Sequence, residues 1–462
     1  MNTINKQIIM VAWGAILVFA SCNKYLDKKP DKSLVEPSTM EDLQAILDNK
    51  TLMNNYSPSV DEACSDDYYL SATRYAGFLD FAQKAYTWQL DGNAMDQAYN
   101  NISYNEWSIL YDQINKANIV LDNISNANGS SNPTIANSVH GQALFYRGYA
   151  FFQLVLLFSQ SYDGSNAGSQ QGIVLKLNSS TEYDHERSSL SASYSQIISD
   201  LSQSTALLDD LPEIVTRPSK CAAFALLARV YLSRQQYDSA LYFAKESLTL
   251  DSSLLNYNNT SDVNIASNTK PFQQFNKEVI FQKISTQYIF PNTYPLYCNV
   301  DSVLYKSYEA DDLRLKAFFW TNGDGYSFKG SYSGTRNNLF KGIATDELYL
   351  DCAECFIRRG QMTEGLSYLN TLLINRYTTG KYQVPAFSSQ QEALQFVLQE
   401  RRKELLFRSV RWMDLKRLNR EGAGIIQTRV IDGRLYTLPS NANQYAIPIP
   451  SYIITQTGIS QN

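Results

Sequence analysis

Cys22 is the residue whose neighbours most clearly predict a chemical modification. It follows Phe19-Ala20-Ser21 and closes an apolar run that begins at Ile8, after a basic N-terminal region. This run is too short to cross the hydrocarbon core of a membrane, which takes ~20 residues as a helix. The pattern is typical of a lipoprotein signal peptide, so residues 1–21 are expected to be removed and the thiol of Cys22 to be acylated.

Aromatic side chains gather in two polar stretches, residues 66–104 and 286–332. Sugar recognition uses aromatic faces against the apolar side of pyranose rings, with amides and carboxylates nearby for the hydroxyl groups. The alternative is that many of these rings only hold loops against helices. The candidates for ligand contact, tryptophans first because of their large faces, are Trp320, Trp88, Tyr288, Tyr294, Tyr326, Tyr68 and Tyr69.

Cys352 and Cys355 have the C-x-x-C spacing of a redox dithiol or of half a zinc site. The sequence has no second such pair, and its only histidines are His140 and His185. Cys352 also falls on a packing position of a predicted helix. Buried structural thiols are therefore expected, with no metal site and no cofactor. The cysteines other than Cys22 are odd in number, which argues against a complete disulfide framework.

Two pairs of adjacent acids, Asp66-Asp67 and Asp311-Asp312, would suit glycoside hydrolysis only if folding placed one acid of each pair ~5–9.5 Å apart. Adjacent acids in polar segments are more often helix caps or solvated loop charges. The sequence has no G-x-S-x-G elbow, H-E-x-x-H motif, P-loop or complete EF-hand, and residues 322–325 predict a turn. The chain is therefore predicted not to be an enzyme.

A cluster of charged residues lies on the predicted helix 390–419. The charges alternate in sign at spacings of three and four, which favours an ion-pair network over a clamp for a ligand carboxylate. Trp412 and Met413 are expected to anchor this helix in the core. The cluster consists of Glu400, Arg401, Arg402, Glu404, Arg408, Arg411 and Asp414.

Helices dominate the elements that must position these residues. Strands are expected chiefly at 279–283 and 445–450. Residues 22–37 suit a lipidated tether, and 38–462 are expected to form one domain with long loops at about 161–188 and 251–340. Apolar residues recur at helical spacing over 38–49, 104–124, 138–158, 190–210, 219–233, 238–250, 345–358, 363–376 and 390–419.

Two helix pairs repeat one pattern, in which an aromatic, an apolar and a small residue on the first helix precede a small residue on the second. This is the spacing of tetratricopeptide repeats. Small residues let the two helices approach closely, and aromatic residues fill the groove beside them. The matching residues are Phe224, Leu227, Ala228, Tyr231 and Ala240 in the first copy and Tyr349, Cys352, Ala353, Phe356 and Gly365 in the second.

Composition excludes some classes of partner. The 462 residues carry a formal net charge of −5 at pH 7, so the chain lacks the basic patch that binds nucleic acid or an anionic membrane surface. Its 32 tyrosines suit recognition of a polar ligand or a protein surface, although most are expected to fill helix-packing positions.

Seven sequence blocks, in the same order along the chain, resemble those of the RagB/SusD family of nutrient-uptake outer-membrane lipoproteins. Each block alone is weakly specific, but the ordered series is highly specific. The blocks lie at 22–30, 107–118, 143–158 (with Phe145-Tyr146-Arg147-Gly148-Tyr149), 194–212, 340–370, 400–417 (with Glu400-Arg401-Arg402-x-Glu404-Leu405) and 447–450 (Ile447-Pro448-Ile449-Pro450).

The resemblance implies a mainly α fold, in which tetratricopeptide-like repeats form a scaffold for a loop-rich ligand-binding face. It also implies an outward-facing protein held in the outer membrane only by its lipid anchor. Such proteins capture a glycan or oligosaccharide without catalysis and deliver it to a SusC-like TonB-dependent transporter. The family's ligand contacts lie outside its shared motifs, so the resemblance assigns no binding residue here.

Two alternatives remain open from the sequence. In one, the protein keeps the transporter partner but captures peptides or protein fragments. In the other, the helical repeats bind only another envelope protein and no nutrient. An arc of stacking rings on the loop face favours the glycan, whereas an open groove with exposed backbone and paired charges favours a peptide.

Overall fold

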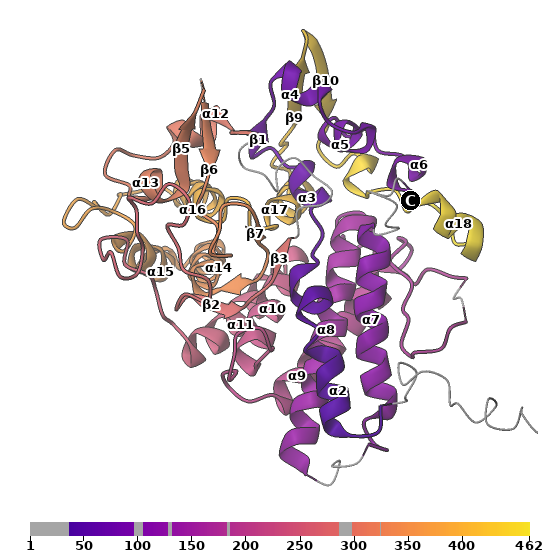
Figure 1. Ribbon diagram of the computed structural model, residues 1–462. Coiled ribbons are helices and arrows are strands. Elements are labelled where there is room, and N and C mark those ends of the chain that lie inside the picture. Colours follow the sequence, from indigo (N-terminus) through magenta and orange to yellow (C-terminus); the bar gives the residue numbers. More distant parts are fainter. Residues whose placement is uncertain (1–36, 97–104, 128–131, 183–184, 286–297, 324) are drawn as a thin grey trace, which may run out of the picture.

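The computed structural model describes residues 37–96, 105–127, 132–182, 185–285, 298–323 and 325–462. This part of the chain is mainly α-helical, as predicted, and its short strands pair two by two (Figure 1). The predicted signal peptide, Cys22 and nearly all of the tether lie outside the described residues. The long helices stand side by side, and most strands lie beyond one end of them, above or to the left in the view of Figure 1.

The helices are α2 (Met40–Leu47), the π-helix η2 (Thr51–Asn55), α3 (Val60–Ala63), α4 (Ala72–Ala76), α5 (Asp80–Tyr86), α6 (Gly92–Met95), α7 (Glu106–Asn123), α8 (Pro133–Phe158), α9 (Leu190–Leu207), α10 (Lys220–Ser233), α11 (Tyr237–Leu250), α12 (Ser302–Lys306), α13 (Arg314–Phe318), α14 (Thr345–Arg358), α15 (Met362–Ile374), α16 (Gln390–Glu404), α17 (Arg411–Arg420), the 3-10 helix η4 (Asn443–Tyr445) and α18 (Ser451–Thr457). The strands are β1 (Tyr68–Tyr69), β2 (Val279–Phe281), β3 (Ile284–Ser285), β4 (Asn299–Val300), β5 (Phe319–Asn322), β6 (Gly325–Phe328), β7 (Leu339–Phe340), β8 (Ile343–Ala344), β9 (Gln427–Ile431) and β10 (Arg434–Leu438).

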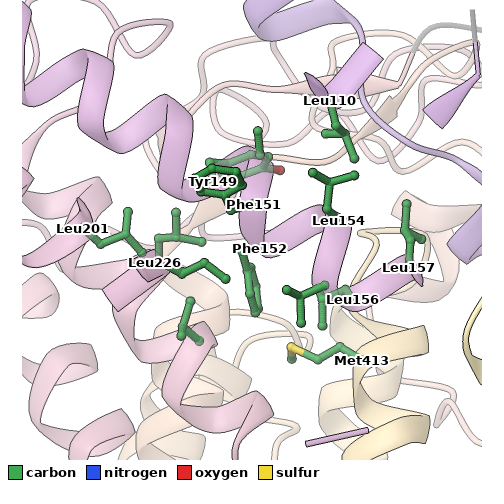
Figure 2. Packing of buried hydrophobic residues seen from close by; sticks show 14 of the residues in the cluster. Leu110, Tyr149, Phe151, Phe152, Leu154, Leu156, Leu157, Leu201, Leu226 and Met413 are labelled. Atoms are coloured by element: carbon green, nitrogen blue, oxygen red, sulfur yellow. The ribbon is translucent and has the colours of Figure 1, made fainter. Parts of the chain in front are cut away.

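Helix α8 is the centre of the main hydrophobic core. Almost every residue from Val139 to its end is buried, and the helix packs against α7 on one side and α9 on the other. Figure 2 shows its side chains meeting Leu110 of α7, Leu201 of α9 and Met413 of α17. A helix that is apolar all round is expected to be buried in this way.

Local sequence sets where the long helices begin. The side chain of Asn105 accepts a hydrogen bond from the backbone N–H of Ser108 at 2.9 Å, which caps α7. Pro133 stands at the first turn of α8, where no backbone N–H is needed. Ser189 and Ser219 cap α9 and α10 in the same manner as Asn105. The helices therefore start where polar side chains satisfy their free backbone donors.

The two predicted repeats are the helix pairs α10–α11 and α14–α15, which pack against one another through α11 and α14. Gly365 lies where α15 crosses α14. A Cβ atom at this position would stand 2.6 Å from Cγ1 of Ile357 and 2.7 Å from the carbonyl oxygen of Ala353. The close approach of the two helices therefore requires a residue without a side chain.

Replacing Gly365 with Ala is expected to lower the free energy of unfolding by about 1–3 kcal/mol, because the added methyl group overpacks the crossing. Urea denaturation measures this change. Gly168→Ala is the control, since a Cβ atom there meets nothing within 4 Å. Equal stability of the two variants would contradict the crossing geometry.

Residues 251–340, expected as a long loop, contain much of a second hydrophobic core. Phe272, Phe318 and Tyr332 pack there with rings from the 66–86 region. Strand β1 pairs with β4, and β3 with β7, so each partner comes from far along the chain. Strands of two residues with distant partners leave no periodic signal in the local sequence. These strands were therefore not predicted from the sequence.

The predicted helix 390–419 is broken into α16 and α17. Phe407 and Ser409, in the connection, have φ values of 58° and 60°, a left-handed conformation that no helix can continue. The backbone N–H of Ser409 donates to the carboxylate of Glu62. Trp412 and Met413 are buried, as predicted.

The second predicted strand, 445–450, is also wrong, whereas the first contains β2. Residues 446–450 have no regular structure and run from η4 to α18. The backbone N–H of Ile447 donates to the carbonyl of Leu157 at the end of α8. The alternation of Ile and Pro there matches an extended segment that packs on a helix end without a strand partner.

Buried ion pairs connect the second core to α15 and α16, which form a further hydrophobic cluster with α14, and the charged cluster predicted from the sequence takes part in this network. Arg314 of α13 contacts Glu400 at 2.6 Å and Glu404 at 3.0 Å, both on α16. Arg376, just after α15, contacts the same Glu404 at 2.7 Å and Glu278, just before β2, at 2.8 Å. Burial alone would raise the pKa of Glu404, but the charges of Arg376 and Arg314 lower it.

Replacing Glu404 with Gln is expected to cost about 3–5 kcal/mol of stability, because it leaves two buried guanidinium groups without their shared carboxylate. Asp238→Asn is the matched control, since Asp238 pairs with Arg359 in an exposed position and such pairs contribute about 1 kcal/mol or less. Chemical denaturation compares the two. A Glu404 effect as small as the control would contradict the structural role of the network.

Candidate functional site: an aromatic surface and an amide-lined cavity

The predicted ligand-contact residues divide into three groups. Tyr288 and Tyr294 lie outside the described residues. Tyr68 and Trp88 are buried, with 1% and 6% of their surface exposed. Tyr69, Trp320 and Tyr326 are at least partly accessible. The structure therefore does not bring all seven residues to one surface.

Tyr68 has a structural role where ligand contact was expected. Its hydroxyl donates to the carbonyl of Ala63 at 2.8 Å, and the guanidinium of Arg429 lies 5.2 Å from its ring centroid. Successive side chains of a strand point to opposite sides, so the next residue of β1, Tyr69, is exposed while Tyr68 is in the core. Only Tyr69 offers a ring face to a ligand.

Trp88 is also held in the protein by specific contacts. Its indole N–H donates to the carbonyl of Cys64 at 2.9 Å, and Arg429 lies 5.2 Å from its ring centroid. Its φ of 56° places it in a turn after α5. The small exposed part of the side chain lines the cavity described below.

The hairpin β5–β6 presents Trp320 and Tyr326 on its two opposite faces. Trp320 pairs with Ser327 across the hairpin, whereas Tyr326 pairs with Thr321. Directly paired residues share a face, and neighbours along a strand do not. The turn predicted at 322–325 closes this hairpin, and Asn322 pairs with Gly325. The two rings therefore cannot stack on the same sugar unit.

Tyr326 stacks on Tyr305 of α12. The two ring centroids are 3.6 Å apart and the planes differ by 9°. Tyr305 also meets the edge of Phe319, which is buried in the second core. This stack gives a broad, partly exposed aromatic face on a rigid support.

Trp320, on the other face of the hairpin, lies under the guanidinium of Arg336, 3.9 Å from the ring centroid. Its indole N–H is buried and has no hydrogen-bond partner among the described residues.

We call Tyr69, Tyr305, Trp320 and Tyr326 the aromatic surface. Their elements are neighbours, because β4 contacts β1, β6 and α12.

The adjacent acids are part of the ion-pair network. Asp66 contacts Arg411 at 2.7 Å, and despite burial Arg411 and Arg402 hold its pKa well below the usual value. Burial raises the pKa of Asp67 to about 6, although Arg402 opposes the shift. Asp312 binds Arg314 at 2.7 Å. These three carboxylates are thus engaged by arginines inside the protein.

The C-x-x-C pair has the structural role expected of it. Cys352 and Cys355 are free, buried thiols on α14, and burial raises the pKa of each well above its ordinary value. Among the described residues, no cluster of histidine, cysteine and acidic side chains has the geometry to hold a metal ion.

A cavity of about 510 Å³ lies where distant parts of the chain meet. Seven of its fifteen lining residues are Gln or Asn, and among the predicted residues that the structure describes only Trp88 is found there. No local sequence signal indicates this cavity, because its walls come from separate irregular segments. The lining residues are Cys64, Trp88, Leu90, Ser159, Gln160, Gln170, Gln171, Arg187, Asn443, Gln444, Ala446, Ile447, Pro448, Gln461 and Asn462.

Two family models match the chain. Residues 24–232 match the SusD-like model described as starch-binding associating with outer membrane, and residues 320–462 match the model of the SusD family, also called SusD/RagB. The chain belongs to the SusD family. No helix of the described residues is both long and apolar enough to cross a membrane.

Solved SusD-type structures share the fold. A SusD superfamily protein from Bacteroides thetaiotaomicron is 21% identical, with 92% of this chain and 99% of that one covered and a TM-score of 0.72. A SusD-like carbohydrate binding protein from Bacteroides vulgatus is 19% identical, with 91% and 97% covered and a TM-score of 0.69. A SusD superfamily protein from Bacteroides fragilis is 19% identical, with 92% of this chain and 99% of that one covered and a TM-score of 0.71. No curated protein matches the sequence.

The two tryptophans are expected to respond differently to truncation. Trp88→Ala should lower the free energy of unfolding by about 3–5 kcal/mol, as large core truncations do. Trp320→Ala should cost about 1–2 kcal/mol, because it loses partial burial and one cation–π contact. Thermal and urea unfolding measure both. Similar losses for the two variants would contradict their different positions.

Proposed function

We propose that this SusD-family protein captures a glycan or oligosaccharide at the outer membrane and passes it to a SusC-like TonB-dependent transporter. The observation that carries the proposal is the aromatic surface, supported by membership of the family. Four partly or fully accessible rings stand on neighbouring short elements above the second core, on a rigid support. Binding residues commonly occupy such positions on a scaffold.

The chemistry of the aromatic surface suits sugar rings. Outside their mutual stack, the partly exposed rings of Tyr305 and Tyr326 offer apolar area for the C–H side of a pyranose. The partly exposed ring of Trp320 adds apolar area on the other face of the hairpin. Since Trp320 and Tyr326 lie on opposite faces of the hairpin, a long chain that wraps its edge would use both.

The carboxylates of the two acid pairs argue against hydrolysis of a bound glycan and are compatible with delivery alone. Asp66, Asp67 and Asp312 are engaged by arginines and are therefore unsuited to act as a general acid and a nucleophile on a glycosidic bond. The proposed anchor is an acyl chain on Cys22, which would hold the domain at the outer membrane beside its transporter.

Capture is tested with residues 23–462, which lack Cys22, titrated calorimetrically against purified polysaccharides, oligosaccharides and peptides. Saturable binding of one glycan is expected. Trp320→Ala and Tyr326→Ala should each weaken it by about two- to tenfold, because a stacking contact contributes ~0.5–1.5 kcal/mol. Tyr242→Ala, an exposed tyrosine on helix α11 of the first repeat, is the matched control and should have no effect.

The outcomes separate the alternatives. Glycan binding that neither Trp320→Ala nor Tyr326→Ala changes would refute the aromatic surface as the site while leaving capture in place. A response to peptides alone would favour capture of protein fragments. Absence of binding across the whole panel would contradict nutrient capture and favour an envelope protein as the only partner.

A further inference from the structure

The amide-lined cavity is separate from the aromatic surface, since none of Tyr69, Tyr305, Trp320 and Tyr326 lines it. Its volume of about 510 Å³ lies within the ~300–1,000 Å³ of typical small-molecule sites. Its walls come from the end of α8, the segment after it, the turn after α5 and the C-terminal region. Such a convergence of distant segments can hold polar groups in fixed positions around a ligand.

Arg187 is the only charged side chain among the described residues that line this cavity. Its guanidinium donates to the carbonyl oxygens of Gly172 at 2.7 and 2.9 Å, Phe158 at 3.0 Å and Ser460 at 3.3 Å. Within the described part of the chain, no carboxylate lies within ion-pair distance of it. The positive charge is thus fixed in place by neutral groups and has no counter-charge there.

This arrangement differs from that of the buried arginines discussed above. Arg314 and Arg376 each contact at least two carboxylates. Carbonyl groups can satisfy the hydrogen bonds of a guanidinium but cannot neutralise its charge. Burial lowers the pKa of Arg187 to about 10, which still leaves it protonated at neutral pH. An anionic ligand would supply the missing charge.

Two further polar atoms in the lining lack partners. The hydroxyl of Ser159, which is 1% exposed, and the side-chain carbonyl of Gln170 are both buried without a hydrogen bond in the described structure. A buried polar group without a partner costs about 1–3 kcal/mol. Both residues line the cavity, and a small rotation of either side chain would bring its unpartnered atom to a hydroxyl group of a bound molecule.

We propose that this cavity is a second ligand site, which takes a small hydroxylated carboxylate such as a uronic acid. The carboxylate faces Arg187, and the hydroxyl groups pair with Ser159, Gln170 and the neighbouring amides. Leu90, Ile447 and Pro448 provide the apolar part of the wall, with the exposed part of Trp88. The proposal concerns a different set of residues from the aromatic surface and does not depend on glycan capture there.

Galacturonic acid and galactose make a matched pair of probes, because they differ only in the carboxylate at C6. Calorimetric titration of residues 23–462 should show saturable binding of galacturonate, about tenfold or more tighter than any binding of galactose. Added salt should weaken the galacturonate interaction. Equal affinity for the two sugars, or no saturable binding of either, would overturn the proposal.

Variants place the binding in the cavity. Arg187→Gln should abolish the preference for galacturonate. Because that change also loses structural hydrogen bonds, Ser159→Ala serves as a second variant. Its hydroxyl has no partner to lose within the described protein, so the fold should be kept while affinity for galacturonate falls about threefold to tenfold. Thermal unfolding checks the fold of each variant.

Tyr242→Ala, at an exposed position on α11, is the control and should bind galacturonate as the unchanged protein does. Galacturonate binding that survives both Arg187→Gln and Ser159→Ala would place the ligand elsewhere and refute this site. Because polysaccharide capture is read from Trp320→Ala and Tyr326→Ala, its failure and the failure of the cavity proposal are distinguishable.

Discussion

The structure depends on arginine–carboxylate pairs that are buried between the second core and the cluster formed by α14, α15 and α16. Glu404 alone is shared by Arg314 and Arg376, and Arg376 carries the network on to Glu278 beside β2. Removing charges from water is costly, so such pairs persist only when several partners hold each group. They fix the direction in which the repeat helices meet the strands, which a purely apolar contact would leave less defined.

The position of the aromatic surface depends on these ion pairs. The second core, held against α16 by Arg314, supports the hairpin that carries Trp320 and the stacked pair of Tyr305 and Tyr326. The cavity lies instead at the end of α8, beside the main core. The two sites that we propose would thus divide the ligands, with the aromatic surface for extended ones and the cavity that contains Arg187 for small ones.

The sequence predicted the scaffold better than the sites. Regular apolar spacing revealed both repeats, and the small residue Gly365 marked their helix crossing. The break at Phe407 and Ser409 was missed, because it depends on a contact from Glu62 that is remote in sequence. Aromatic composition singled out Tyr68 and Tyr69 alike, but only the pairing of β1 with β4 decides which is exposed. The cavity was not predictable, since its residues share no local pattern.

The alternation of faces along the β5–β6 hairpin has a consequence for how this protein can change over evolution. Phe319 and Phe328 fix one face of the hairpin to the second core, whereas Trp320 and Asn322 occupy the other. Substitutions at the partly exposed positions 320 and 322 are therefore expected to alter the outer chemistry with less effect on the fold than substitutions at Phe319 or Phe328. Related proteins with the same scaffold could therefore bind different ligands. The low sequence identity to solved structures of the same fold is compatible with such divergence.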